Sequence, residues 1–290
     1  MRKVKLTFIL LFACLFTACQ QNNYKYARNI FFTNESEKFK VHIEYYDFSS
    51  RSESFETITA TGENIKDICI DICRQENMNF RLCENVYISP TLVEKNADVL
   101  FDAINSVQMP LAVNLWCFNG EIIPENTNKE LLSTRLYNLS MSKNKIEGVI
   151  AVYDRLPDNN GAVILSENKI VRYIDDIEWN VLNVITGDAE NISLQIEEEN
   201  MYAKLKNCNV YFSGEKEIVL NFSAFLADYK GVSNGILYEN SFKERIETEI
   251  ENTIYQLYSD VNMVSAFNLY WYENQRQVKT DNITVNVTIL

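Results

Sequence analysis

The chain has 290 residues, of which 47% are hydrophobic and 12% aromatic, and its formal net charge is −13. This composition is typical of a globular protein with a sizeable core and excludes an intrinsically disordered chain. The excess of acidic residues disfavours binding to nucleic acid and to anionic lipid, because both carry negative charge. Only 8 glycines and 4 prolines favour long regular elements and argue against a glycine-rich phosphate-binding loop.

The first eighteen residues have the layout of an export signal. Three basic residues are followed by an apolar run over 6–16, too short for the roughly 20 residues that cross a hydrocarbon core. Cys19 follows the small residues Thr17 and Ala18, as in a bacterial lipoprotein signal. We therefore predict that residues 1–18 are removed and that the Cys19 thiol takes a diacylglyceryl group carrying palmitate-type chains. The lipid would anchor the protein on the outer face of the membrane, and residues 19–23 would be a polar tether.

Two alternatives to lipidation at Cys19 stay open. Cys14 also follows a small residue, Ala13, but the bulky Phe12 precedes it and the apolar run before it is shorter. The other alternative is an ordinary cleaved signal with an incidental cysteine. If the chain is cleaved after residue 18, with or without lipidation, the remaining part has 24 basic and 40 acidic residues, a net charge of −16.

Residues 24–118 predict an N-terminal α+β domain, because strands and helices alternate along them. Strands are expected at 39–48, 81–89 and 111–117, and helices at 62–76 and 91–105. The first helix has an apolar stripe made of Ile65, Ile68, Cys69, Ile72 and Cys73. Residues 119–145 are polar, with a weak helix expected at 130–139, and we interpret them as a connector or a reduced middle domain.

From residue 146 the pattern changes to consecutive strands, then a long helix and a final strand. Strands are expected at 161–165, 170–174, 192–196, 201–205, 217–227 and 283–289. The turn Ser166–Lys169 indicates a hairpin, and Ser241 with Glu244 forms a capping box for a helix over 241–260. The helix has an apolar stripe of Phe242, Ile246, Ile250, Ile254 and Leu257. We predict a C-terminal α+β domain over 146–290, a largely antiparallel sheet with a long helix packed across it.

The cysteines after Cys19 are interpreted as small hydrophobic packing groups. They are Cys69, Cys73, Cys83, Cys117 and Cys208. An odd number cannot all pair within one chain, although an exported protein can form disulfides. A soft-metal site built from Cys69, Cys73 and Cys83 is the alternative, but the ligand spacing of zinc sites is absent.

Neither the lone histidine nor the acidic clusters predict an active site. His42 lies on the polar side of an alternating strand, and no nucleophile motif accompanies it. Asp175, Asp176 and Glu178 form a cluster whose spacing identifies no chemistry. We therefore predict a protein that is not an enzyme and has no cofactor and no metal.

One segment resembles a calcium-binding loop by coincidence. Asp158, Asn160, Gly161 and Glu167 match positions of an EF-hand, but Leu156 stands where the first acidic ligand is needed. We interpret the segment as a polar turn that enters a hairpin.

The order of these features resembles a known family. After the lipidation-type cysteine, a strand over 41–48 leads to the glycine-initiated helix at Gly62, and residues 80–88 run into a short strand. The segment 161–171, Gly-Ala-Val-Ile-Leu-Ser-Glu-Asn-Lys-Ile-Val, is similar to a Gly-x-Ala-Val-Phe hairpin ending in Lys-Leu-Val that opens the family's C-terminal domain. The helix 241–260 and the last strand match the family's ending. The chain thus resembles the C-subunit lipoproteins of bacterial spore germinant receptors, the GerC-type family.

The resemblance implies a non-enzymatic, membrane-anchored receptor subunit that takes part in nutrient-triggered spore germination. Its partners would be integral-membrane A-type and B-type subunits, together with membrane lipid through Cys19, the one site residue that carries over. The alternatives are a solute-binding lipoprotein of a membrane transporter, a tethered hydrolase and a cell-envelope lipoprotein of unknown role. The aromatic segment Tyr270-Trp271-Tyr272 is the candidate partner-binding surface; the alternative is that Tyr270 and Tyr272 face the core while Trp271 covers an edge.

Overall fold

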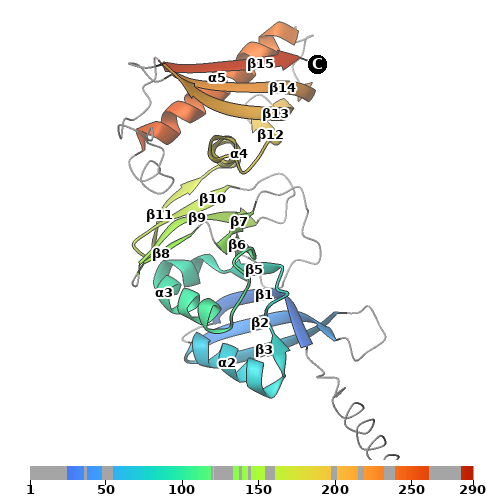
Figure 1. Ribbon diagram of the computed structural model, residues 1–290, viewed down its shortest axis with the longest axis vertical. Helices are drawn as coiled ribbons and strands as arrows, with labels where there is room; N and C mark the ends of the chain where they lie inside the picture. Colours follow the sequence, from blue (N-terminus) through green and yellow to red (C-terminus); the bar gives the residue numbers. More distant parts are fainter. Residues whose placement is uncertain are drawn as a thin grey trace, which may run out of the picture.

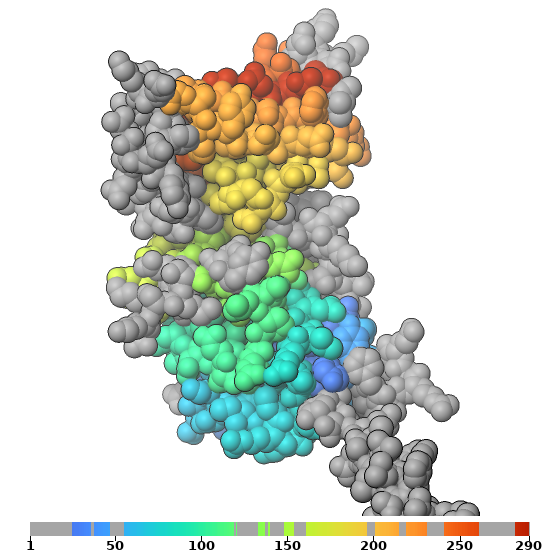
Figure 2. Space-filling model, viewed as in Figure 1, coloured from blue at the N-terminus to red at the C-terminus, as the bar shows by residue number. Residues whose placement is uncertain are grey.

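The computed structural model describes residues 25–35, 38–47, 55–118, 120, 133–136, 139–142, 145–153, 161–196, 201–214, 219–231, 239–260 and 282–289. Two sheets follow one another along the longest axis of the molecule, with a short helix between them (Figure 1). The first sheet and its helices form the part that runs from blue to yellow-green, and the second sheet with the last helix forms the part that runs from yellow to red (Figure 2). Among the described residues, none of the helices is both long and apolar enough to cross a membrane.

The first sheet is mixed and has eleven strands, whose main path runs β11-β10-β9-β6-β5-β1-β2-β3. The strands are β1 (Lys25–Glu35), β2 (Lys38–Asp47), β3 (Phe55–Gly62), β4 (Met78–Asn79), β5 (Asn85–Ile88), β6 (Asn114–Phe118), β7 (Thr134–Arg135), β8 (Ser140–Ser142), β9 (Lys145–Tyr153), β10 (Ala162–Ser166) and β11 (Lys169–Ile174). The central strands β1, β5, β6 and β9 are parallel, and the strands on both sides of them are antiparallel. Parallel neighbours need crossover connections, and helices α2 and α3 provide two of them.

Helices α2 (Ile65–Gln75) and α3 (Pro90–Ser106) cover the same face of this sheet. Asn64 is the N-cap of α2, and its side chain accepts hydrogen bonds from the backbone N–H groups of Lys66 and Asp67 at 2.9 and 3.3 Å. The apolar stripe expected on this helix is buried except at its last member, Cys73, which is half-buried. The predicted helices 62–76 and 91–105 are therefore confirmed, with ends shifted by a few residues.

The second sheet has four strands in the order β12-β13-β14-β15. They are β12 (Ile192–Ile196), β13 (Met201–Ser213), β14 (Val219–Gly231) and β15 (Ile283–Ile289). The first three are antiparallel, and β15 is parallel to β14. Helix α5 (Glu239–Ser259) lies across one face of this sheet, and all five members of its predicted apolar stripe are at most 1% exposed (Figure 1). The predicted α+β class is confirmed, including the long helix on a largely antiparallel sheet.

A continuous hydrophobic cluster joins the two sheets. On the face of the first sheet opposite α2 and α3, five aromatic rings pack with neighbouring centroids 5.5 to 5.7 Å apart, and they belong to Phe31, Tyr87, Trp116, Phe118 and Tyr153. Helix α4 (Asp176–Thr186) contributes Trp179 and Leu182 to the same cluster, which continues into the second sheet and α5. Each large apolar side chain buried here contributes about 1.5–3 kcal/mol relative to exposure.

Several strands differ from the expectation. β1 was not expected because Ile30, Phe31 and Phe32 are all buried, and burial on both faces removes the alternation that indicates a strand. β3 was also missed, since its side chains are mostly exposed. The weak helix expected at 130–139 is wrong where the structure describes it, because Thr134 and Arg135 form β7.

The sheets do not follow the boundary expected between 145 and 146. β9 pairs with β6, so the hairpin β10–β11 extends the first sheet instead of opening the second. The hairpin itself is confirmed, and its turn residues Glu167 and Asn168 both have positive φ, as a tight hairpin turn requires. The capping box expected at Ser241 is wrong, because α5 begins at Glu239 and Ser241 lies inside the helix.

An arginine links β11 of the first sheet to α4 and to the end of α5. Arg172 on β11 forms ion pairs with Glu178 on α4 and, at 2.5 Å, with Asp260 just after α5. Glu178 is 6% exposed, and its carboxylate also accepts the backbone N–H of Asp175 in the capping box that starts α4. Burial raises the pKa of the Glu178 carboxyl, and the Arg172 guanidinium opposes that shift in part.

This shift predicts how stability depends on pH. A carboxyl with a raised pKa in the native state holds its proton there after the unfolded chain has lost it. Stability therefore falls as pH rises above the ordinary value of 4.5, until the native-state pKa is passed. We expect the wild type to lose thermal stability relative to Glu178→Gln as pH rises through this window, measured as unfolding midpoints by circular dichroism. The exposed-site control Glu190→Gln should follow the wild type throughout, and a relative gain by the wild type would show instead that the arginine dominates.

Candidate functional site

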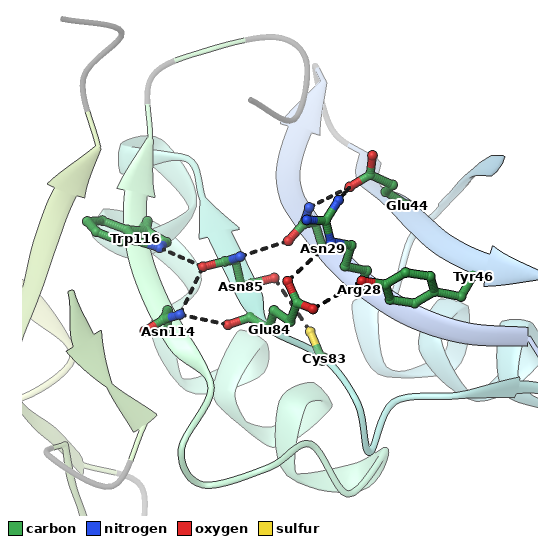
Figure 3. Close-up of polar contacts among 9 residues, drawn as sticks. All are labelled: Arg28, Asn29, Glu44, Tyr46, Cys83, Glu84, Asn85, Asn114 and Trp116. Atoms are coloured by element: carbon green, nitrogen blue, oxygen red, sulfur yellow. Dashed lines mark hydrogen bonds and ion pairs between the residues drawn. The ribbon is translucent and has the colours of Figure 1, made fainter. Parts of the chain in front are cut away.

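Three asparagines lie side by side across the parallel strands of the first sheet. Asn29 on β1 is in register with Asn85, the first residue of β5, and Asn85 is in register with Asn114, the first residue of β6 (Figure 3). Asn29 and Asn85 are each 4% exposed. A row of buried amides is costly unless every polar atom has a partner, so the contacts of this row decide what it does.

The three amides bond to one another in series. Asn85 Nδ2 donates to Asn29 Oδ1 at 2.9 Å, while Asn114 Nδ2 and Trp116 Nε1 donate to Asn85 Oδ1 at 3.0 and 3.2 Å. At one end of the row, Asn29 Nδ2 donates to Glu44 Oε2 at 2.5 Å. The series therefore runs without a break from a carboxylate on β2 to an indole on β6, and we call it the asparagine ladder.

Charged residues cover one end of the asparagine ladder. Arg28 Nε donates to Glu84 Oε2 at 3.1 Å, and the Tyr46 hydroxyl donates to Glu84 Oε1 at 3.1 Å (Figure 3). The Arg28 guanidinium also lies 3.8 Å from Glu44 and stacks 4.2 Å from the centre of the Phe55 ring. Burial, together with the charge of Glu84, raises the pKa of the Tyr46 hydroxyl, so that it stays a donor.

The asparagine ladder keeps the strands of the first sheet in register, and its arrangement is structural and not catalytic. Its amides are neutral and bond to one another, and it lies at the amino ends of β5 and β6. Ligands of open α/β sheets bind at the opposite, carboxyl ends of the strands. Sequence reasoning missed the ladder, although each asparagine directly precedes an apolar run (Asn29-Ile-Phe-Phe, Asn85-Val-Tyr-Ile and Asn114-Leu-Trp-Cys-Phe), a shared pattern that could have indicated it.

The described cysteines are free thiols, and their burial agrees with packing as small hydrophobes. Four are buried and Cys73 is half-buried. Burial raises the pKa of the Cys69, Cys117 and Cys208 thiols to about 12 and raises that of Cys83 further, so the reactive thiolate is suppressed. Within the described ranges, no group of three histidine, cysteine, aspartate or glutamate side chains is placed to hold a metal ion.

The remaining candidates have structural roles or lie outside the described residues. His42 Nδ1 is 2.6 Å from the Thr59 hydroxyl, and burial together with Lys40 lowers the pKa of its imidazole. In the acidic cluster, Asp175 and Glu178 form the capping box of α4, so their spacing marks a helix start. Outside the described ranges are Cys14, Cys19, Asp158, Asn160 and the aromatic segment 270–272.

Comparisons with known proteins find a likeness in structure. No family model matches the chain, and no curated protein matches it. A solved structure titled "Crystal Structure of the GerBC protein" aligns over 91% of this chain and 96% of that chain, at 13% identity and a TM-score of 0.45. At this identity and TM-score the likeness assigns no function.

Removal of the middle amide, that of Asn85, should break the asparagine ladder and destabilise the fold. Asn85→Ala leaves Asn29 without its donor and Trp116 without its acceptor, and each buried unpaired group costs about 1–3 kcal/mol. We expect the free energy of unfolding to fall by about 2–4 kcal/mol in urea titrations. The matched control Asn209→Ala, at an exposed strand position, should change it by less than about 0.5 kcal/mol. Equal effects of the two substitutions would contradict a locking role.

Proposed function

We propose that this protein is a non-enzymatic, lipid-anchored subunit of a spore germinant receptor, held on the outer face of the membrane. It works beside integral-membrane A-type and B-type subunits during nutrient-triggered germination. The observation that carries the proposal is the amino-terminal sequence, in which a basic start and an apolar run lead to Cys19 ahead of a body that resembles the GerC-type family.

The anchor explains how an acidic protein stays at an acidic surface. Each buried methylene of an acyl chain contributes about 0.8 kcal/mol, and a single chain binds only marginally. A diacylated Cys19 provides two chains or more, so attachment does not depend on electrostatic attraction to lipid. The polar tether 20–23 then separates the lipid from β1, which begins at Lys25.

The described part of the chain supports a function in binding to other proteins and not in catalysis. Its buried thiols are held in the protonated form, and the lone imidazole bonds to Thr59 on the neighbouring strand. The alternative of a solute-binding lipoprotein is less well supported, because such proteins have alternating strand and helix units in both lobes. In the second sheet, β12, β13 and β14 instead follow one another as an antiparallel series.

Lipidation at Cys19 is the first test of this proposal. Metabolic labelling with an alkyne fatty acid should tag the wild-type chain, and Cys19→Ser should abolish the label and leave an unprocessed precursor on gels. Cys14→Ser is the matched control and should label normally. Loss of the label in Cys14→Ser alone would move the anchor to Cys14. Absence of label on the wild-type chain would exclude a lipoprotein.

The receptor role is tested separately, in spores. A deletion strain should lose germination with at least one nutrient, and the wild-type gene should restore it while the Cys19→Ser gene does not. An affinity-tagged chain solubilised in mild detergent should recover an integral-membrane A-type or B-type subunit. Normal germination of the deletion strain with every nutrient, together with recovery of neither subunit, would overturn the proposal.

A further inference from the structure

The first sheet ends in an open edge at β3. β3 is the last strand of the path, and no strand within the described residues pairs with its outer side. Unpaired N–H and C=O groups along such an edge are a template for another extended segment. Charged side chains can block pairing at a strand edge, but β3 carries none from Thr57 to its end. Its exposed side chains there are those of Thr57, Thr59 and Thr61.

A groove of about 640 Å³ runs between this edge and α2. Its lining follows β3 from Ile58 to Gly62 and one side of α2 from Asn64 to Glu76. Its apolar lining consists of Ile58, Ala60, Ile68 and Ile72. An open strand edge with a helix alongside is the arrangement in which peptide-binding domains add a strand from their ligand.

The groove is acidic. Glu63, Asp67, Asp71 and Glu76 line it, and none of its lining residues is basic. Lys66, between two of them in the sequence, turns away and forms an ion pair with Asp102 on α3 at 2.8 Å. Of the four carboxylates, Glu76 is paired with Lys25 at 2.7 Å. The exposed Asp67 and Asp71 are therefore placed to receive positive charge from a ligand.

The spacing of these aspartates matches an extended chain. Asp67 and Asp71 are one helical turn apart on the same side of α2, a rise of about 6 Å. Side chains on one face of an extended strand repeat every ~6.6 Å. Two basic side chains at alternate positions of a strand laid along β3 can therefore reach both carboxylates, while the backbone of that strand bonds to the edge.

We propose that this groove binds an extended, basic segment of a partner protein, which adds to the first sheet as a strand beside β3. The basic side chains on one face of the segment lie over the apolar lining and reach the carboxylates of Asp67 and Asp71. A second copy of this chain fits poorly, because pairing of two β3 edges brings the acidic groove walls of both copies together. The inference stands apart from the receptor proposal, since it rests on the edge and the groove alone.

The test is a binding measurement with a defined probe. A fluorescein-labelled heptapeptide that alternates lysine with valine is titrated with the full chain in mild detergent, and binding is followed by fluorescence anisotropy. Asp71→Lys should weaken binding by about tenfold or more, because it places a like charge in the groove. The matched control Asp98→Lys, at an exposed position in the middle of α3, should change binding by less than about twofold. Thermal unfolding of both variants checks that each is folded.

Methylation of the probe's backbone distinguishes strand addition from simple charge attraction. In an extended strand, alternate N–H groups point to opposite sides, so only one set faces β3. Of two probes N-methylated at either alternate set, one should bind about tenfold more weakly than the other. Equal binding of both methylated probes, equal effects of Asp71→Lys and Asp98→Lys, or no binding of the unmethylated probe would each overturn the proposal.

Discussion

The need to cover both faces of a parallel sheet governs this structure. The strands β1, β5, β6 and β9 lie in the interior of the first sheet and carry apolar side chains on both faces. α2 and α3 cover one face, and the aromatic rings of the other face pack into the cluster that includes α4. A parallel sheet left open on one side would expose this surface to water. The second sheet and α5 are joined to the first sheet through the same cluster, so the two parts share a core and not only a linker.

The asparagine ladder complements this apolar core. A hydrophobic face tolerates a slip of two residues, since that slip keeps the same side chains inside. Three in-register amides do not tolerate it, because each would lose its neighbour and the buried Asn29 and Asn85 would each lose a hydrogen-bond partner. The row thus selects one register for β1, β5 and β6, and the ion pairs of Arg28 with Glu44 and Glu84 extend that selection to β2.

Polar groups with structural roles lie inside the protein, and those open to contact with other molecules lie at its surface. Buried groups such as Asn85, Glu178 and the free thiols have their hydrogen-bonding or packing needs met inside the protein. Among the residues that the structure describes, strand-edge groups without a pairing strand and clustered carboxylates lie outside, at the edge of β3 and along α2. This organisation suits the binding of neighbours, and under the proposed function a lipid at Cys19 would supply those neighbours at a high local concentration.

The amino-acid sequence by itself determined the elements whose neighbours in the chain dictate them. The apolar stripe of α5, the alternation in β15 and the turn between β10 and β11 are local patterns, and all three were predicted. Only the tertiary structure decided which sheet β9, β10 and β11 join, that β1 is a strand, and that Asn29, Asn85 and Asn114 meet. These features depend on pairing between residues far apart in the chain, and burial on both faces erases the periodicity that would reveal them.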